Sequence, residues 1–130
     1  MAKILIAEDE AALRALVARA LVEDGHVVTV APDGAEALEA LGREPFDLLL
    51  ADIKMPVMDG IALALAAARD YPALVVMLMT GYADQRERAC GLEALIHDVL
   101  TKPFTLAELR HAVSGVLAAA RPAAGLLKTL

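Results

Sequence analysis

Short apolar runs alternate with helix-like segments along the whole chain. The apolar runs, each short enough to be a buried strand, cover residues 3–7, 27–31, 47–51, 74–79 and 96–100. After each run, apolar side chains recur every three or four residues, over 11–24, 34–41, 60–69, 84–93 and 105–119. This second spacing predicts helices that are buried on one face. The pattern therefore predicts five strand–helix units.

Five such units in succession are typical of an α/β fold. We expect a five-stranded, doubly wound parallel sheet with strand order 2-1-3-4-5 and helices on both faces, the flavodoxin-like arrangement. Thr105 and Glu108 can form a capping box at the start of the last helix. Pro122 and Gly125 interrupt the pattern of that helix, so we expect one domain over 1–120 and a short tail over 121–130.

Reactive polar side chains follow four of the predicted strands. They are Glu8 and Asp9 after the first, Asp52 after the third, Thr80 after the fourth and Lys102 after the fifth. Ligands of open α/β sheets bind outside the carboxyl ends of the strands, so these side chains should converge on one crevice. The expected strand order places Asp9 and Asp52 on either side of that crevice.

The predicted cluster favours phosphoryl transfer to a carboxylate. Two carboxylates about 4 Å apart repel by roughly 4 kcal/mol at an effective dielectric of 20, so a cation should accompany them. Mg²⁺ suits a few carboxylates together with phosphate oxygens. Asp52 would be the nucleophile, Glu8 and Asp9 would hold Mg²⁺, and Thr80 and Lys102 would bind the remaining phosphoryl oxygens.

Composition and charge argue against several classes of function. The net charge is −6, and two Tyr, two Phe and no Trp leave little surface for stacking on bases, which argues against a nucleic-acid surface of the usual kind. The apolar runs are far shorter than the roughly 20 residues of a membrane span, and acids interrupt the first one too early for a secretory signal. One cysteine excludes an internal disulfide. We expect a cytoplasmic protein that binds neither DNA nor a membrane.

Four segments together resemble the receiver domain of bacterial two-component response regulators, of the single-domain, chemotaxis-regulator-like kind. They are Ile-Leu-Ile-Ala-Glu-Asp-Glu (4–10), Leu-Leu-Leu-Ala-Asp-Ile-Lys-Met-Pro-Val-Met-Asp-Gly (48–60), Met-Thr-Gly (79–81) and Thr-Lys-Pro-Phe (101–104). Each segment alone is weak evidence, whereas all four in order at strand ends are highly specific. The resemblance covers about residues 3–119.

The resemblance implies a phosphoprotein that acts in a phosphorelay. The donor would be a histidine kinase or a histidine phosphotransfer protein, and the chain would catalyse only its own phosphoryl transfer and dephosphorylation. The backbone carbonyl of Lys54 would be a further Mg²⁺ ligand, and the bond between Lys102 and Pro103 would be cis. Asp59 and Gly60 would form the turn and helix start that shape the loop after Asp52.

The chain departs from the family pattern at one position of the expected switch. Receivers usually carry Tyr or Phe three residues before the lysine, where this chain has Val99. We expect Tyr82 to take over part of that role. Lys54 and Tyr82 also flank the expected path of the water that hydrolyses the aspartyl phosphate, so the resemblance predicts a long phosphoryl lifetime.

The expected output is a change in protein–protein contacts, without an output domain. Within the family the chain looks most similar to cell-cycle regulators of the CpdR type, for which the downstream partner would be a protease adaptor system. One alternative is a receiver cut from a larger regulator or hybrid kinase. A Mg²⁺-dependent aspartyl-phosphate phosphatase would need a second Asp where Lys54 stands, and a flavin carrier would need a first loop that is not acidic.

Overall fold

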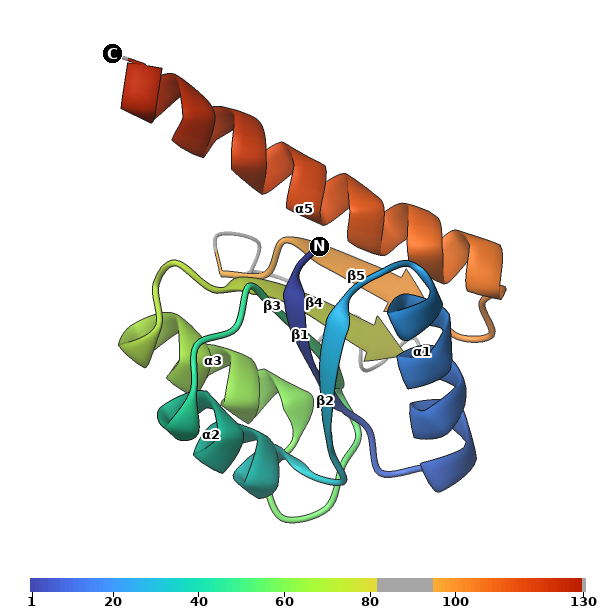
Figure 1. Ribbon diagram of the computed structural model, residues 1–130. Helices are drawn as coiled ribbons and strands as arrows, with labels where there is room; N and C mark the ends of the chain where they lie inside the picture. The colour runs from blue at the N-terminus through green and yellow to red at the C-terminus, as the bar shows by residue number, and fades with distance from the viewer. Residues whose placement is uncertain (82–94, 130) are drawn as a thin grey trace.

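A five-stranded parallel sheet lies between two layers of helices in the computed structural model, which describes residues 1–81 and 95–129, with side chains to residue 120 (Figure 1). The strands are β1 (Lys3–Ala7), β2 (Val27–Ala31), β3 (Leu48–Asp52), β4 (Val75–Thr80) and β5 (Asp98–Thr101). The helices are α1 (Ala11–Glu23), α2 (Gly34–Arg43), α3 (Gly60–Asp70) and α5 (Leu106–Thr129). The strand order β2-β1-β3-β4-β5 confirms the predicted doubly wound sheet.

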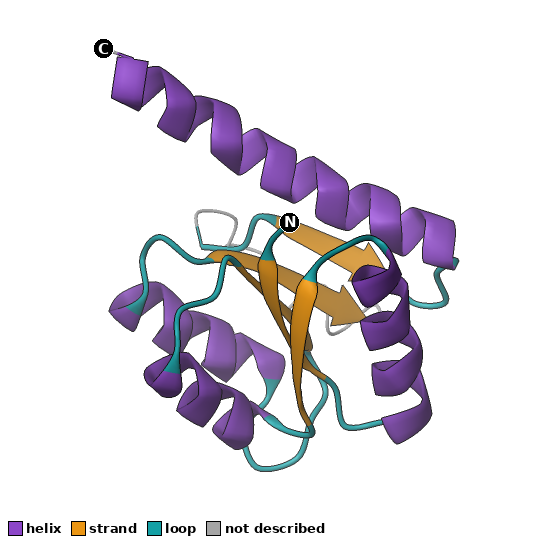
Figure 2. Cartoon of the chain, viewed as in Figure 1, coloured by secondary structure: helices purple, strands orange, loops and turns teal. Residues whose placement is uncertain are grey.

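Successive side chains of the central strands point to opposite faces of the sheet and so form two cores. One core lies under α2 and α3 and includes Leu5, Leu49 and Leu78, and the other lies under α1 and α5 and includes Ile4, Leu50 and Met77. All five residues of β3 are buried. Strands buried on both faces are nearly continuous apolar runs, which is why these segments were recognisable in the sequence. Figure 2 shows the two helical layers on either side of the strands.

Side-chain caps fix where three of the helices begin. The carboxylate of Asp33 accepts a hydrogen bond from the N–H of Glu36 at 2.8 Å, which starts α2. Thr105 and Glu108 form the predicted capping box at the start of α5, with both hydrogen bonds at 3.0 Å. Such caps satisfy backbone N–H groups that have no partner within the helix. The predicted helix over 84–93 lies outside the described residues.

The last helix is longer than the sequence pattern predicts. We expected it to end near Ala119 and a short tail to follow, but α5 continues to Thr129 through Pro122 and Gly125. Proline removes one backbone donor from a helix and costs about 3 kcal/mol in its interior. The residues around Pro122 are mostly alanine and leucine, which are the best helix formers, and their summed propensity favours continuation of the helix.

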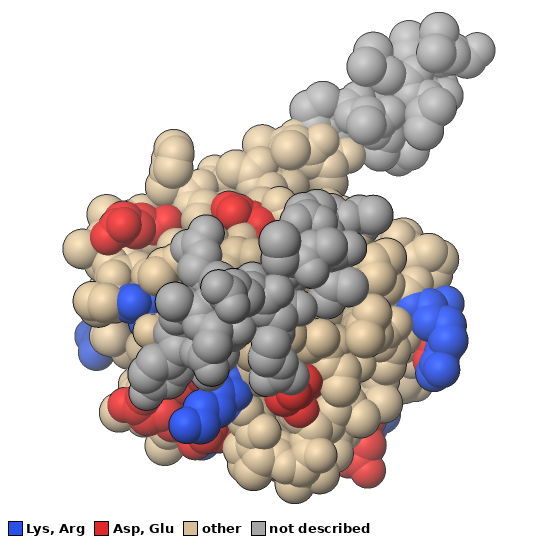
Figure 3. All heavy atoms as spheres, turned by 180° about the vertical axis from the view of Figure 1, so that it is seen from behind, with Lys and Arg blue, Asp and Glu red and all other residues tan. Residues whose placement is uncertain are grey.

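Charged side chains of both signs are spread over the surface. On the face shown in Figure 3, small basic groups lie next to acidic ones, between larger uncharged regions. Within the part of the chain that the structure describes, no helix has the length and apolar character needed to cross a membrane.

Candidate functional site

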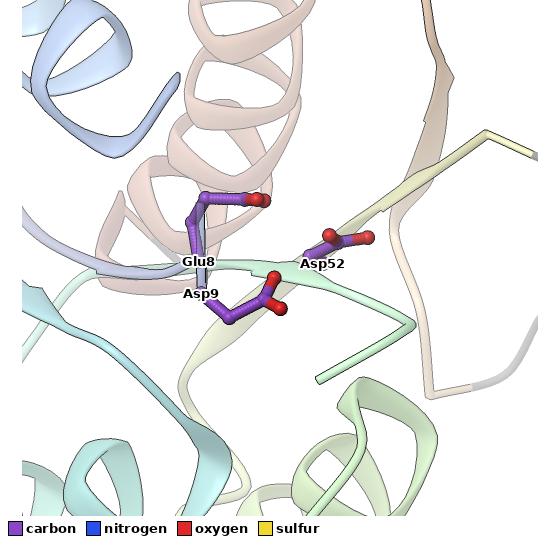
Figure 4. Close-up of side chains that lie close together, drawn as sticks. All are labelled: Glu8, Asp9 and Asp52. Carbon is purple, nitrogen blue, oxygen red and sulfur yellow. The ribbon is translucent and has the colours of Figure 1, made fainter. Parts of the chain in front are cut away.

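Three carboxylates meet at the carboxyl edge of the sheet. Glu8 and Asp9 directly follow β1, and Asp52 is the last residue of β3, the strand that pairs with β1. One oxygen from each carboxylate lies within 4.8 Å of the other two. Figure 4 shows the side chains of Glu8 and Asp9 extending from the end of β1 toward the side on which Asp52 lies. Glu8 and Asp52 are buried, whereas Asp9 is exposed.

A lysine from the far edge of the sheet completes this cluster. The Nζ atom of Lys102, which follows β5, lies 2.9 Å from Oδ2 of Asp52 and 3.3 Å from Oε2 of Glu8. The same residue donates its backbone N–H to the carbonyl of Thr80 at 2.7 Å. The sheet register brings these groups together, because Thr80 is paired with Thr101 across β4 and β5.

Several hydrogen bonds hold Glu8 in place. Its backbone N–H donates to the carbonyl of Ala31 at 3.1 Å, and its carboxylate accepts the N–H of Glu10 at 3.2 Å. Nη1 of Arg14, in the first turns of α1, donates to the Glu8 carbonyl at 2.9 Å. The loop that carries the acids is therefore attached to both β2 and α1.

The environment of the cluster shifts the pKa of two of its members. Burial, together with the nearby negative charge of Asp52, raises the pKa of Glu8 from 4.5 to about 7, although Lys102 opposes this shift. Burial lowers the pKa of Lys102, but hydrogen bonds and charge attraction from Asp52 and Glu8 outweigh it, so the net pKa is raised. Lys102 is therefore protonated at neutral pH, and Glu8 is poised to gain or lose a proton there.

The loop between β3 and α3 is held tightly beside Asp52. A Cβ atom on Gly60 would lie 2.2 Å from the Asp52 carbonyl oxygen, and the Gly60 N–H donates to the Ile53 carbonyl at 2.8 Å. Asp59 caps α3 by accepting the N–H of Ala62 at 2.8 Å. These contacts agree with the expected structural role of Asp59 and Gly60. Lys54, within the loop, is exposed and lines the pocket above Asp52.

The structure brings most of the predicted site residues to one pocket. Its lining includes Glu8, Asp9, Glu10, Asp52, Lys54, Gly81, Lys102 and Pro103. Thr80 is fully buried at the end of β4, and the bond between Lys102 and Pro103 is cis, as the resemblance implied. Tyr82 lies outside the described residues. Val99 lies in β5, half-buried against the core under α2 and α3 rather than at the pocket.

The sequence did not identify Arg14 as part of the site. Arg14 lies six residues after Glu8, and its guanidinium reaches back to the Glu8 carbonyl. One signal was present: a basic residue near the N-terminus of a helix opposes the helix dipole, which favours acids there. An unfavourably placed arginine can therefore indicate a specific partner, here the backbone of the acidic loop.

The donor set of this pocket fits a divalent cation. Oxygens bound to one Mg²⁺ at about 2.1 Å can be no more than about 4.2 Å apart, so the 4.8 Å spacing requires only small side-chain rotations. Carboxylate oxygens are the ligands that this ion prefers. Burial and the negative charge of Asp52 raise the pKa of Glu8 more than Lys102 lowers it, so a further cation would stabilise the ionised cluster.

This fold and this acidic pocket define a receiver domain. The chain matches the family model of the response regulator receiver domain over residues 4–114, and it belongs to that family of two-component signalling proteins. The resemblance found in its four sequence segments is thus confirmed.

Two proteins similar in sequence and one solved structure show which receivers this chain resembles. The chain is 42% identical over 120 residues to the response regulator receiver protein CpdR of Brucella abortus, a match that covers 92% of this chain and 100% of CpdR. It is 43% identical over 107 residues to the transcriptional activator protein PfeR of Pseudomonas aeruginosa, covering 82% of this chain but 35% of PfeR. The response regulator TrrA of Thermotoga maritima, solved in complex with Mg²⁺ and BeF, superposes with a TM-score of 0.80 at 28% identity, over 89% of this chain and 99% of TrrA.

Proposed function

We propose that Asp52 accepts a phosphoryl group from a histidine kinase or a histidine phosphotransfer protein and that this modification switches protein–protein contacts. The observation that carries the proposal is the position of the Asp52 carboxylate. It is nearly buried, it lies within 4.8 Å of oxygens of Glu8 and Asp9, and Nζ of Lys102 lies 2.9 Å from it. A buried anion surrounded by further anions and one mobile cation suits a group that is modified rather than one that only packs.

The reaction would be an in-line displacement at phosphorus. An oxygen of the Asp52 carboxylate forms a bond to the phosphorus of a phosphohistidine, the P–N bond breaks, and its electron pair stays on the imidazole of the donor. The imidazole then takes up a proton from solvent. The transfer would need no general base, because positioning and charge stabilisation can supply nearly all of the catalysis. The chain would catalyse only this transfer and the later hydrolysis of its own acyl phosphate.

Lys102 would stabilise both the unphosphorylated Asp52 and its phosphorylated form. Its ammonium pairs with the Asp52 carboxylate, and the flexible side chain can follow the charge onto a phosphoryl oxygen. Thr80, at the neighbouring strand end, would donate its hydroxyl to another phosphoryl oxygen. Both groups would therefore bind phosphoryl oxygens once the phosphoryl group is attached to Asp52.

Mg²⁺ is the proposed cofactor. Glu8, Asp9 and Asp52 would supply carboxylate ligands, and the backbone carbonyl of Lys54 would supply a further oxygen. When bound, the ion would neutralise charge on the phosphoryl oxygens. The presence of Mg²⁺ and BeF in the TrrA complex supports this proposal, since TrrA has the same fold.

The proposed output is contact with a downstream protein rather than with DNA. The match to CpdR spans the whole of that receiver protein, which supports a function that a receiver domain carries out alone. A protease adaptor system as the downstream partner stays a prediction of the CpdR-type resemblance. The long phosphoryl lifetime expected from Lys54 and Tyr82 stays a prediction as well.

A small phosphodonor tests the proposal without any partner protein. We expect acetyl phosphate with Mg²⁺ to add the mass of one phosphate to the wild-type chain, measured by intact mass spectrometry. Asp52→Ala should gain none, and a chelator should abolish the gain. Asp70→Asn is a matched control, because Asp70 is an exposed carboxylate at the end of α3. Phosphate on Asp52→Ala, or labelling of wild type in the presence of the chelator, would contradict the proposal.

A further inference from the structure

A strained valine lies at the tip of the loop between β3 and α3. Val57 has φ 70°, and among the described residues it is the non-glycine residue with positive φ. The N–H of Met58 donates to the carbonyl of Pro56 at 2.8 Å, so Val57 is the central residue of a γ-turn. The form with positive φ is rare and strained. A positive φ is least favourable for a β-branched side chain such as valine.

Both flanks of this turn are fixed, so it cannot relax. On one side, the side chain of Met55 is buried in the core under α2 and α3. On the other side, the backbone of Met58 lies so close to α2 that a Cβ on Gly34 would be 2.2 Å from the Met58 carbonyl oxygen. Strained backbone persists only where the surrounding structure holds it in this way.

The unfavourable backbone conformation of Val57 is not compensated by packing of its side chain within the described fold. Val57 is 85% exposed, the largest value for a large apolar residue in the described part of the protein. An exposed apolar residue alone is ordinary. Combined with a backbone conformation that disfavours valine, the exposure means that this side chain stabilises no part of the described fold. A contact outside the chain would account for both features.

The position of Val57 indicates which contact this is. Its loop forms one side of the pocket through Lys54. Val57 lies five residues after Asp52, so their Cα atoms are at most about 18 Å apart, and less because the loop turns back to Gly60. A typical protein interface buries about 800 Å² on each partner, which corresponds to a disc of about 16 Å radius. A protein seated over the pocket therefore also covers the tip of this loop.

We propose that Val57 is an apolar anchor for the protein that donates the phosphoryl group to Asp52. The anchor rests on the proposed function above. The Asp52 side chain is 8% exposed, so a phosphohistidine ring must enter the pocket, and the surface around that ring must settle on its rim. Glu10, an exposed acid, lines the pocket, and the exposed Val57 lies on the loop that brings Lys54 to the same pocket. The donor that fits has an apolar hollow for the valine and a basic group opposite Glu10.

Phosphotransfer from purified donors tests the anchor. The probes are the histidine kinases and phosphotransfer proteins of the source organism, each phosphorylated beforehand and mixed with the full chain. Val57→Thr keeps the branched shape and the backbone constraint but adds a hydroxyl. We expect it to lower kcat/KM with the preferred donor at least about fivefold, and Val57→Asp at least about tenfold. Val27→Thr is the control, because Val27 is an exposed valine at the amino end of β2, away from the pocket. Its kcat/KM should stay within about twofold of wild type.

Melting temperature and labelling by acetyl phosphate show whether Val57 acts through contact with the donor, through backbone strain or through the chemistry of the pocket. Val57→Gly removes both the strain and the side chain, so its melting temperature should rise by about 3 °C while transfer from the donor falls as in Val57→Thr. Acetyl phosphate should label Asp52 in all three Val57 variants at the wild-type rate. Transfer to Val57→Thr and Val57→Asp at the wild-type rate would overturn the anchor and leave the proposed function intact. Slow labelling of these variants by acetyl phosphate would also overturn it, because Val57 would then act on the pocket itself.

Discussion

Lys102 and Asp52 are 50 positions apart in the chain, yet Nζ of Lys102 lies 2.9 Å from Oδ2 of Asp52. The same ammonium also contacts Glu8, from a third strand end. The Lys102 ammonium therefore bridges two buried carboxylates across the carboxyl edge of the sheet. This relationship determines how the site should respond to mutation, to pH and to metal.

Removing this cation should destabilise the metal-free protein. In Lys102→Met two buried carboxylates lose their partner, and we expect the free energy of unfolding to fall by about 2 kcal/mol. The loss is below that of a fully buried pair because the Lys102 side chain is 22% exposed. Urea unfolding in the presence of a chelator measures it. Lys54→Met, at the exposed rim of the same pocket, is the matched control and should change stability by less than about 0.5 kcal/mol. Equal effects of the two substitutions would contradict the prediction.

The raised pKa of Glu8 predicts how stability depends on pH. Its pKa is about 7 in the folded protein against an ordinary value of 4.5, so the folded state holds this proton more tightly than the unfolded state. Its contribution to stability is therefore complete below about pH 4.5 and is lost as the pH rises through 7.

We expect Glu8→Gln to remove this pH dependence. The difference in free energy of unfolding between the variant and wild type should change by up to about 3 kcal/mol from pH 4.5 to pH 8, in favour of the variant at high pH. Urea unfolding without metal at several pH values measures the difference. Adding Mg²⁺ at pH 8 should restore the stability of wild type more than that of Glu8→Gln. A difference that stays constant with pH would show that Glu8 has no raised pKa.

Metal affinity should depend on Asp9 much more than on the adjacent acid. Asp9 contributes an oxygen to the cluster and is exposed, so Asp9→Asn should lower Mg²⁺ affinity at least about tenfold with little change in stability. Calorimetric titration with Mg²⁺ measures the affinity. Glu10→Gln removes the same unit of charge one residue further on, outside the cluster, and should change affinity less than about threefold. Similar losses in both variants would mean that general charge, rather than coordination, binds the ion.

Two glycine substitutions should have opposite effects. A Cβ at Gly60 would lie 2.2 Å from the Asp52 carbonyl oxygen, so Gly60→Ala should lower the free energy of unfolding by about 3 kcal/mol and slow labelling by acetyl phosphate. A Cβ at Gly115, within α5, would meet nothing within 4 Å. Gly115→Ala should raise stability by about 0.5–1 kcal/mol, because alanine is the better helix former. Thermal unfolding measures both, and a neutral Gly60→Ala would show that the loop can move away from Asp52.

The sheet and most of the acidic site could be predicted because their signals are local. A continuous apolar run such as Leu48–Ala51 predicts a buried strand of a parallel sheet. The residue that follows the run then lies at the carboxyl edge of the sheet. The extent of α5 could not be predicted from local signals. Pro122 and Gly125 each oppose a helix, whereas the alanines and leucines around them favour it, and only the sum decides.

By itself, the sequence determined the order of the described strands and helices and the acids and lysine that meet at one edge, since these follow from residue type and period. It determined the family through the resemblance of four segments to a receiver domain. Only the tertiary structure decided the pairing of Lys102 with two carboxylates, the raised pKa of Glu8, the reach of Arg14 and the positive φ of Val57. The physical reason is that distance, burial and strain depend on segments far apart in the chain. No local pattern of residues records them.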